Sequence, residues 1–146
     1  MNKIEAIFWS VALPGLGQLL NKKYIKGITL VALEIIINVQ ANFNTIIINS
    51  FHGEIEKAIY NTNYQWLMFY PCLYFFSIWD AYKDAAGEQG KYSFLPFVFA
   101  GYFVTVGLIY SSKFKIFGII FGPVWLPILA VIPGLIVGFL LKRLLR

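Results

Sequence analysis

One acidic residue inside an apolar stretch is the first candidate for chemistry. Glu34 lies within the run ITLVALEIIINV, and Asn38 and Asn42 follow it at spacings of four and eight residues. In a helix these three side chains share one face. An ionised carboxylate in hydrocarbon is costly unless it is paired or hydrated, so the stripe could line a polar path or bind a cation. Alternatively, a protonated Glu34 bonds to an Asn or Tyr of another helix, a contact worth about 0.6 kcal/mol on average.

A second pair of acids, Asp80 and Asp84, is separated by one helical turn, with Ser77 one turn earlier. Paired carboxylates can act as general acid and base. Lys83 stands between them in the sequence, and the pair follows an apolar segment. We therefore expect the solvated end of a helix here, with ordinary charge pairs.

Other catalytic or metal-binding patterns are missing from the sequence. His52 is the only histidine and Cys72 the only cysteine, which excludes an internal disulfide and a cysteine metal cluster. The sequence has no nucleophile-elbow, phosphate-loop or zinc-protease motif. We expect no catalytic residues, no metal and no cofactor, and hence no enzyme.

The composition is that of a chain dissolved in lipid. Hydrophobic residues make up 59% and charged residues 13%, with a mean hydropathy of +0.69, whereas soluble domains average about 25% charged residues. The net charge of +5 comes from basic residues in short loops and at the C-terminus. They are typical of topology signals and contacts to anionic lipid headgroups, and we expect no nucleic-acid partner.

Five apolar segments follow one another along a single domain, and their continuous runs exclude an alternating β-barrel. We predict an all-α, multi-pass bundle with four clear spans plus an N-terminal element that is a short span, a re-entrant element or an interfacial helix. Pro14 and Gly15 should break that first element, and we expect no signal-peptide cleavage after it. The segments are residues 4–20, 27–45, 64–82, 92–110 and 116–141.

Several local features refine these segments. Tyr64 and Tyr82 are 18 steps apart, about 27 Å along a helix, as expected for aromatic side chains at both interfaces. The second half of 27–45 is rich in Asn and should face protein or water. A short amphipathic helix is predicted within residues 51–63. Pro123, Pro127 and Pro133 should kink the last span.

Lysine and arginine counts set the expected orientation. With the loop at 21–26 inside, the C-terminus is also cytoplasmic and residues 51–63 face outward. Met1 is outside if residues 4–20 cross the membrane and inside if they are re-entrant. The inner side then holds eight basic residues: Lys22, Lys23, Lys26, Lys83, Lys91, Lys142, Arg143 and Arg146. The outer side holds three: Lys57, Lys113 and Lys115.

The sharpest local motif is PGLGQLLNKKYIKG, residues 14–27. We expect a structural turn with headgroup contacts, formed by Pro14, Gly15, Gly17, Gln18, Lys22, Lys23 and Lys26. The motif resembles the PGxGQxYNxxxxKG pattern of small prokaryotic multi-pass membrane proteins of unknown function, and it is similar to the two-transmembrane-domain family. Leu19 and Leu20 stand where that pattern often has a tyrosine. The resemblance covers roughly residues 5–40, extends to WDAYKDA at residues 79–85, and implies membrane residence without an established reaction.

These features favour a non-catalytic accessory or scaffold protein of the cell membrane. The alternative is a small ion or solute transporter or channel that uses the stripe of Glu34, Asn38 and Asn42. A membrane enzyme that uses Asp80 and Asp84 is a third hypothesis. The expected partners are the bilayer with its anionic headgroups, and a second copy or another membrane protein, because small-residue patterns such as Gly134-x-x-x-Gly138 permit close helix packing.

Overall fold

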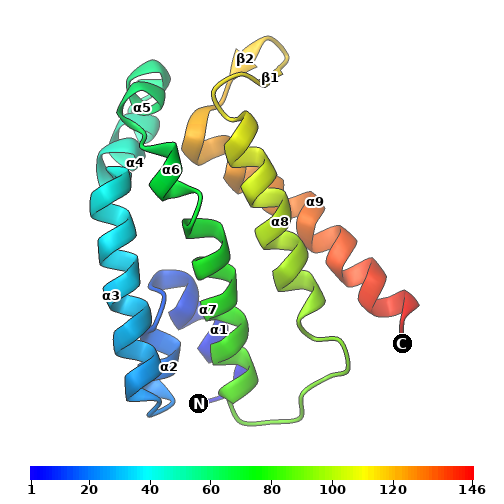
Figure 1. Ribbon diagram of the computed structural model, residues 1–146. Helices are drawn as coiled ribbons and strands as arrows, with labels where there is room; N and C mark the ends of the chain where they lie inside the picture. The colour runs from blue at the N-terminus through cyan, green and yellow to red at the C-terminus, as the bar shows by residue number, and fades with distance from the viewer.

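The computed structural model describes all 146 residues and is almost entirely helical, which confirms the all-α class (Figure 1). The helices are α1 (Lys3–Ala12), α2 (Leu16–Leu20), α3 (Tyr24–Ala41), α4 (Phe43–Phe51), α5 (Ile55–Asn61), α6 (Tyr64–Leu67), α7 (Tyr70–Asp84), α8 (Leu95–Tyr110) and α9 (Gly122–Leu144). A two-stranded antiparallel hairpin, β1 (Lys115–Ile116) and β2 (Ile119–Ile120), joins α8 to α9.

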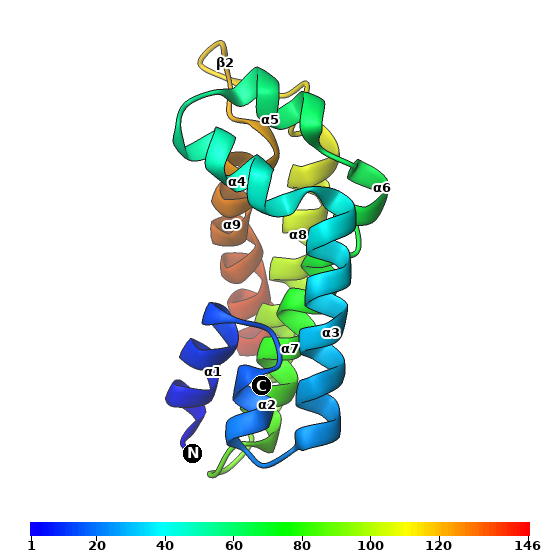
Figure 2. The same cartoon turned by 90° about the vertical axis from the view of Figure 1, so that its left-hand side faces the viewer.

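Four helices, α3, α7, α8 and α9, run lengthwise between two ends of an elongated molecule (Figures 1 and 2). Both chain termini lie toward one end, here the terminal end; α5 and the β-hairpin lie at the other, the α5 end. Two helices are long and apolar enough to cross a membrane: α3, with 18 residues, and α9, with 23. The shorter α8 is also apolar.

The first apolar segment folds as a helical hairpin. α1 rises about halfway from the terminal end, and the chain returns through α2 before α3 begins (Figure 2). The turn needs Gly15, whose φ of +100° is in the left-handed region. A side chain there would also meet the Gly27 carbonyl oxygen of α3 at 2.6 Å. The N-terminus stays at the terminal end, where the Ala86 amide donates to the Met1 carbonyl at 3.0 Å.

The asparagine-rich stretch bends the chain at the other end. α3 stops at Ala41 because Asn42 adopts a left-handed conformation with φ +59°, which asparagine tolerates better than most residues. α4 then lies across the bundle (Figure 2). The lengthwise helix therefore ends at residue 41, before the end of the expected segment 27–45, and it begins earlier, at residue 24. The short helix expected within 51–63 is α5.

Three other expected segments are not single helices over their whole length. The segment 64–82 is interrupted between α6 and α7, because Pro71 occupies the first turn of α7, where its missing N–H costs nothing. The segment 92–110 becomes helical only at Leu95. The last begins with the β-hairpin, whose Phe117 and Gly118 both have positive φ, as in a two-residue primed turn.

The small residues of the last helix pack against another helix of the same chain. A Cβ added to Gly134 would lie 2.8 Å from the Ala100 Cα, and one added to Gly138 would lie 2.5 Å from the Pro96 Cα. α9 therefore packs directly on the backbone of α8. The helix remains continuous through Pro127 and Pro133, and Pro123 lies in its first turn.

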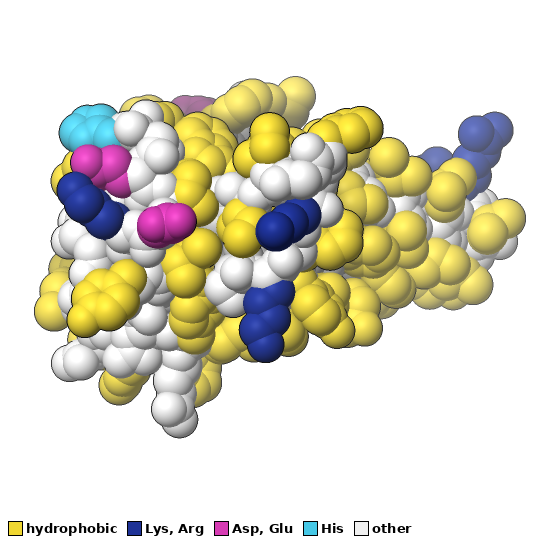
Figure 3. All heavy atoms as spheres, turned by 90° about the horizontal axis from the view of Figure 1, so that it is seen from above, with side chains coloured by type: hydrophobic (Ala, Val, Ile, Leu, Met, Phe, Trp, Pro, Cys, Tyr) yellow, Lys and Arg dark blue, Asp and Glu magenta, His cyan; other side chains and the backbone are white.

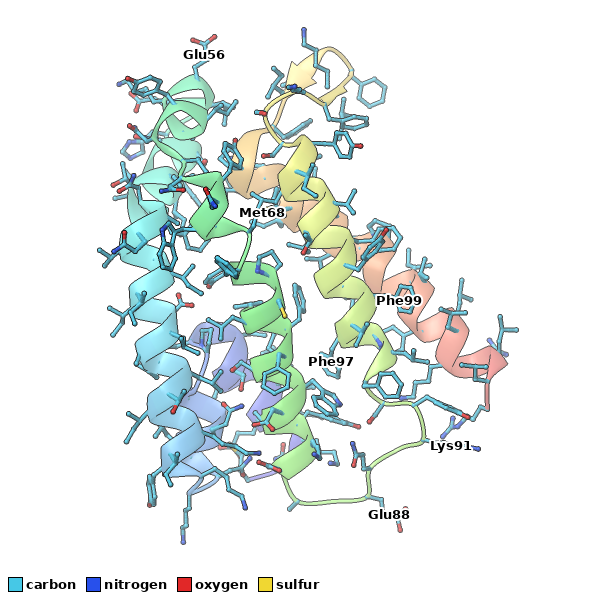
Figure 4. The ribbon with its side chains drawn as sticks, viewed as in Figure 1. Glu56, Met68, Glu88, Lys91, Phe97 and Phe99 are labelled. Carbon is cyan, nitrogen blue, oxygen red and sulfur yellow. The ribbon has the colours of Figure 1, made fainter.

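Charged side chains gather at the two ends of the molecule. Figure 4 shows Glu56 at the α5 end and Glu88 and Lys91 at the terminal end. Figure 3 looks onto the α5 end and shows its histidine and charged groups among apolar and uncharged polar side chains. Near the terminal end, the contact of Tyr82 with Phe97, at 5.8 Å between ring centroids, joins α7 to α8.

Candidate functional site

Residues of the two sequence motifs meet at the terminal end, between α2, α3 and α7. We call Gln18, Lys26, Ser77, Asp80 and Asp84 the polar cluster. Gln18 is fully buried. Its Nε2 donates to the Ser77 carbonyl at 2.8 Å and to Asp80 Oδ2 at 3.1 Å. The Gly15 amide donates to Ser77 Oγ at 3.1 Å. These bonds attach the turn after α1 to the middle of α7.

Lys26 completes the polar cluster. Its Nζ lies 2.8 Å from Asp80 Oδ1 and 2.8 Å from Asp84 Oδ2. The Lys26 side chain is 46% exposed, whereas the side chains of Asp80 and Asp84 are 7% and 16% exposed. The acids are thus paired and largely buried, and the expected solvated helix end is wrong for Asp80. Lys26 was expected at lipid headgroups, but it faces these acids.

The remaining motif residues pack or point outward. Gly17 lies so close to α7 that an added Cβ would be 2.7 Å from the Ala81 Cβ. Asn21 Nδ2 donates to the Ala81 carbonyl at 3.2 Å. Pro14 is buried in the turn, whereas Lys22 and Lys23 are exposed and form no ion pair. Of the three lysines in this motif, Lys22 and Lys23 are therefore the two without an acidic partner.

The chemistry of the polar cluster follows from which atoms are occupied. Lys26 takes one oxygen of Asp80 and Gln18 takes the other. A general base needs a carboxylate oxygen free to reach its substrate. Both Asp80 oxygens instead join α7 to α2 and α3, so the arrangement suits a structural role in fixing the N-terminal hairpin.

Glu34 forms a separate site near mid-height. Its residue is 7% exposed, and its Oε2 has no hydrogen-bond partner. Tyr70 of α7 and Asn38 of α3 lie beside it. A tyrosine of a neighbouring helix is the kind of partner expected for an interhelical contact.

The predicted polar stripe is only partly kept. Asn38 Nδ2 donates to Asn44 Oδ1 at 3.1 Å. Asn42 leaves the helix axis in its left-handed conformation, and its Nδ2 donates to the Asn61 carbonyl at 3.0 Å. Glu34 and Asn38 thus remain neighbours, while Asn42 serves the turn between α3 and α4 near α5.

Other candidate groups do not assemble. His52 ends α4 at the α5 end, and Cys72 is exposed in the first turns of α7. No three residues of the His, Cys, Asp and Glu types are grouped as metal ligands. The site residues that the structure brings together are therefore those of the polar cluster.

The pairing of Lys26 with Asp80 and Asp84 was missed from the sequence because the partners are separated by more than 50 positions. The one signal was that both motif pieces, residues 14–27 and 79–85, carry polar residues next to apolar segments. Comparison of the chain with protein-family models, with curated proteins and with solved structures finds no match.

Proposed function

We propose that the chain is a multi-pass integral membrane protein in which α3, α7, α8 and α9 cross the bilayer and the α1–α2 hairpin re-enters from one side. The observation that carries this proposal is the distribution of charge. Of the charged residues, only Glu34 belongs to the middle of a lengthwise helix and not to one of the two ends (Figure 1). Large apolar side chains are exposed on the flanks, for example Val39, Ile136 and Phe139. Exposing such an apolar surface to water costs about 25 cal/mol of free energy per Å². Contact with lipid removes that cost.

The orientation follows from the same distribution. Because the α1–α2 hairpin leads the chain back to the terminal end, the N-terminus lies on the same side as the loop after α2. Lys3 therefore joins the eight basic residues assigned to the inner side, against three on the outer side. The positive-inside rule then places the terminal end, with both chain termini, in the cytoplasm.

Reporter fusions test this topology. Fluorescent reporters at the N-terminus and at the C-terminus are both expected to be active in the cytoplasm, whereas a periplasmic-type reporter inserted at Gly53, in the exposed loop before α5, is expected to be active outside. An N-terminal reporter on the opposite side from the C-terminal one would contradict re-entry, and detergent-free solubility would contradict membrane residence altogether.

Within the membrane we propose a non-catalytic accessory or scaffold role. The support is that the Asp80 carboxylate, a group capable of chemistry, is occupied on both oxygens: Lys26 and Gln18 each donate to it, and these bonds join three helices. The flanks remain available for contact with a membrane-protein partner or a second copy. Photo-crosslinkers at exposed flank positions Val39 and Ile136 are expected to trap a discrete protein in native membranes, and labelling of lipid alone would count against the role.

One observation favours the transporter alternative: Glu34 is buried with an unpartnered carboxylate oxygen. Buried acids in membranes often mark ion pathways. In that case flux through reconstituted vesicles should depend on Glu34.

A Glu34→Gln variant separates the two proposals. The amide keeps the size and polarity of the side chain, so we expect the membrane level and the unfolding temperature in detergent to stay nearly unchanged, within about 1 kcal/mol of unfolding free energy. A matched Glu56→Gln change at the exposed α5 end serves as the control. Ion flux in wild-type vesicles that disappears with Glu34→Gln alone would support transport, and no flux in either would support the accessory role.

A further inference from the structure

An apolar groove of about 360 Å³ opens on the flank of the molecule. Its walls come from α1, α4, α6, α7, α8 and α9, and include Val11, Phe51, Tyr74, Val104, Ile128 and Val131. Of its 16 lining residues, 13 are hydrophobic. The groove is independent of the polar cluster, none of whose residues lines it.

The groove exists because the first helix stops halfway. Val11 is in the last turn of α1, just before the break at Pro14 and Gly15. Beyond that point no N-terminal helix fills the space beside α7 and α9, and α4 crosses the bundle toward the α5 end (Figure 2). Trp125 Nε1 of α9 donates to the Ser50 carbonyl of α4 at 3.0 Å, which fixes that boundary.

The position of the groove restricts how an occupant can enter. α4 separates it from the α5 end, and the α1–α2 hairpin separates it from the terminal end. Val11, Phe51 and Ile128 lie at its mouth and are 45%, 65% and 51% exposed on the apolar flank. An occupant would therefore enter sideways, from the region that the proposed function assigns to hydrocarbon.

The chemistry and size of the groove restrict the occupant further. The hydroxyl of Tyr74 already donates to the Val11 carbonyl at 2.8 Å, so it is not available to a polar headgroup. A partner helix that crosses the bilayer is about 30 Å long, so it cannot lie lengthwise in a groove that α4 and the α1–α2 hairpin close at its two ends. A flexible hydrocarbon chain can enter such a groove from the side and follow its walls.

We propose that this groove binds one acyl chain of a membrane phospholipid, held more tightly than the surrounding lipid, with its headgroup outside the groove. The inference rests on the proposed membrane residence. Because the N-terminal hairpin reaches only halfway, it leaves a space that a full crossing helix would fill. In this proposal lipid fills that space.

Photolabelling of a residue inside the groove, away from bulk lipid, tests the proposal. Val104 lines the groove and is only 8% exposed. In vesicles of phosphatidylglycerol that carry a diazirine at the middle of one acyl chain, we expect labelling of Val104 and its groove neighbours, detected by peptide mass spectrometry. Labelling confined to exposed flank residues would overturn the proposal.

A filling variant provides the second arm. Val131→Trp should occupy the groove and reduce labelling at Val104 at least tenfold. Val39→Trp adds the same bulk on the exposed flank of α3, outside the groove, and should leave that labelling unchanged. Equal labelling in both variants would overturn the proposal. If Val131→Trp fails to fold, the wild-type labelling pattern alone decides.

Extraction of each protein with carbonate separates this inference from the proposed function. Wild-type protein that stays in the membrane fraction but shows no Val104 labelling rejects only the acyl-chain site. Wild-type protein released from the membrane by carbonate rejects membrane integration itself.

Discussion

A Gly138→Leu variant is expected to lose the native packing of α8 on α9. At this position an added Cβ would lie 2.5 Å from the Pro96 Cα and 2.8 Å from the Leu95 carbonyl oxygen. Both are backbone atoms, so no side-chain rotation relieves the clash, and the helices must separate. Overpacking typically costs 1–3 kcal/mol and occasionally more, and here we expect about 3 kcal/mol or more. Thermal unfolding in detergent, followed by circular dichroism, measures the loss.

A matched change on the other face of α9 controls for added bulk. Leu140 is 55% exposed on the flank, so Leu140→Phe enlarges a side chain that contacts only its surroundings. It should change the unfolding temperature little. Similar losses in the two variants would mean that the close approach of α8 and α9 is not a source of stability.

The helical class and the apolar segments were predictable because they depend on local patterns. Long apolar runs favour helices in lipid, where each amide must bond within its own segment. The break at Pro14 and Gly15 was also predictable, since proline removes a donor and glycine permits a left-handed turn. Whether the broken segment crosses or returns was left open, because that depends on its packing against α3 and α7.

The ends of the helices were less predictable because single residues decided them. Asn42 ends α3 through its own backbone conformation, while the apolar run beyond it continues as α4 in a new direction. The aromatic spacing from Tyr64 to Tyr82 suggested one helix, but Pro71 starts a new one. Phe117 and Gly118 form a turn inside a stretch whose composition resembles a span.

The candidate site was the least predictable part. The sequence showed Glu34 as an acid among apolar residues, and the structure does place it in a buried position. It could not show that Asp80 is buried, because burial there depends on a lysine 54 positions away. Lys83, next to the acids in the sequence, suggested ordinary surface charge pairs. The actual partner of the acids is Lys26, which belongs to α3.

Removal of Lys26, the partner of Asp80, is the second change with a large expected effect on stability. Lys26→Ala is expected to lower the unfolding free energy by about 2–3 kcal/mol, since it leaves the 7%-exposed carboxylate of Asp80 with Gln18 as its only donor. The value stays below that of a fully buried pair because Lys26 itself is 46% exposed. Thermal unfolding in detergent measures it. The exposed pair of Lys57 and Glu54 serves as the control, and Lys57→Ala should cost less than about 1 kcal/mol.

The double variant Lys26→Met with Asp80→Leu distinguishes a buried-charge penalty from lost packing. Removing Lys26 and Asp80 together leaves Asp84, whose side chain is 16% exposed, as the one carboxylate of the polar cluster without its lysine, so part of the stability lost in Lys26→Ala should return. Gln18 still keeps its bond to the Ser77 carbonyl, which continues to attach the N-terminal turn to α7. If the double variant were as unstable as Lys26→Ala, the charge pair would not be what positions the hairpin, and its stability would have to come from the close contacts of Gly15 and Gly17 instead.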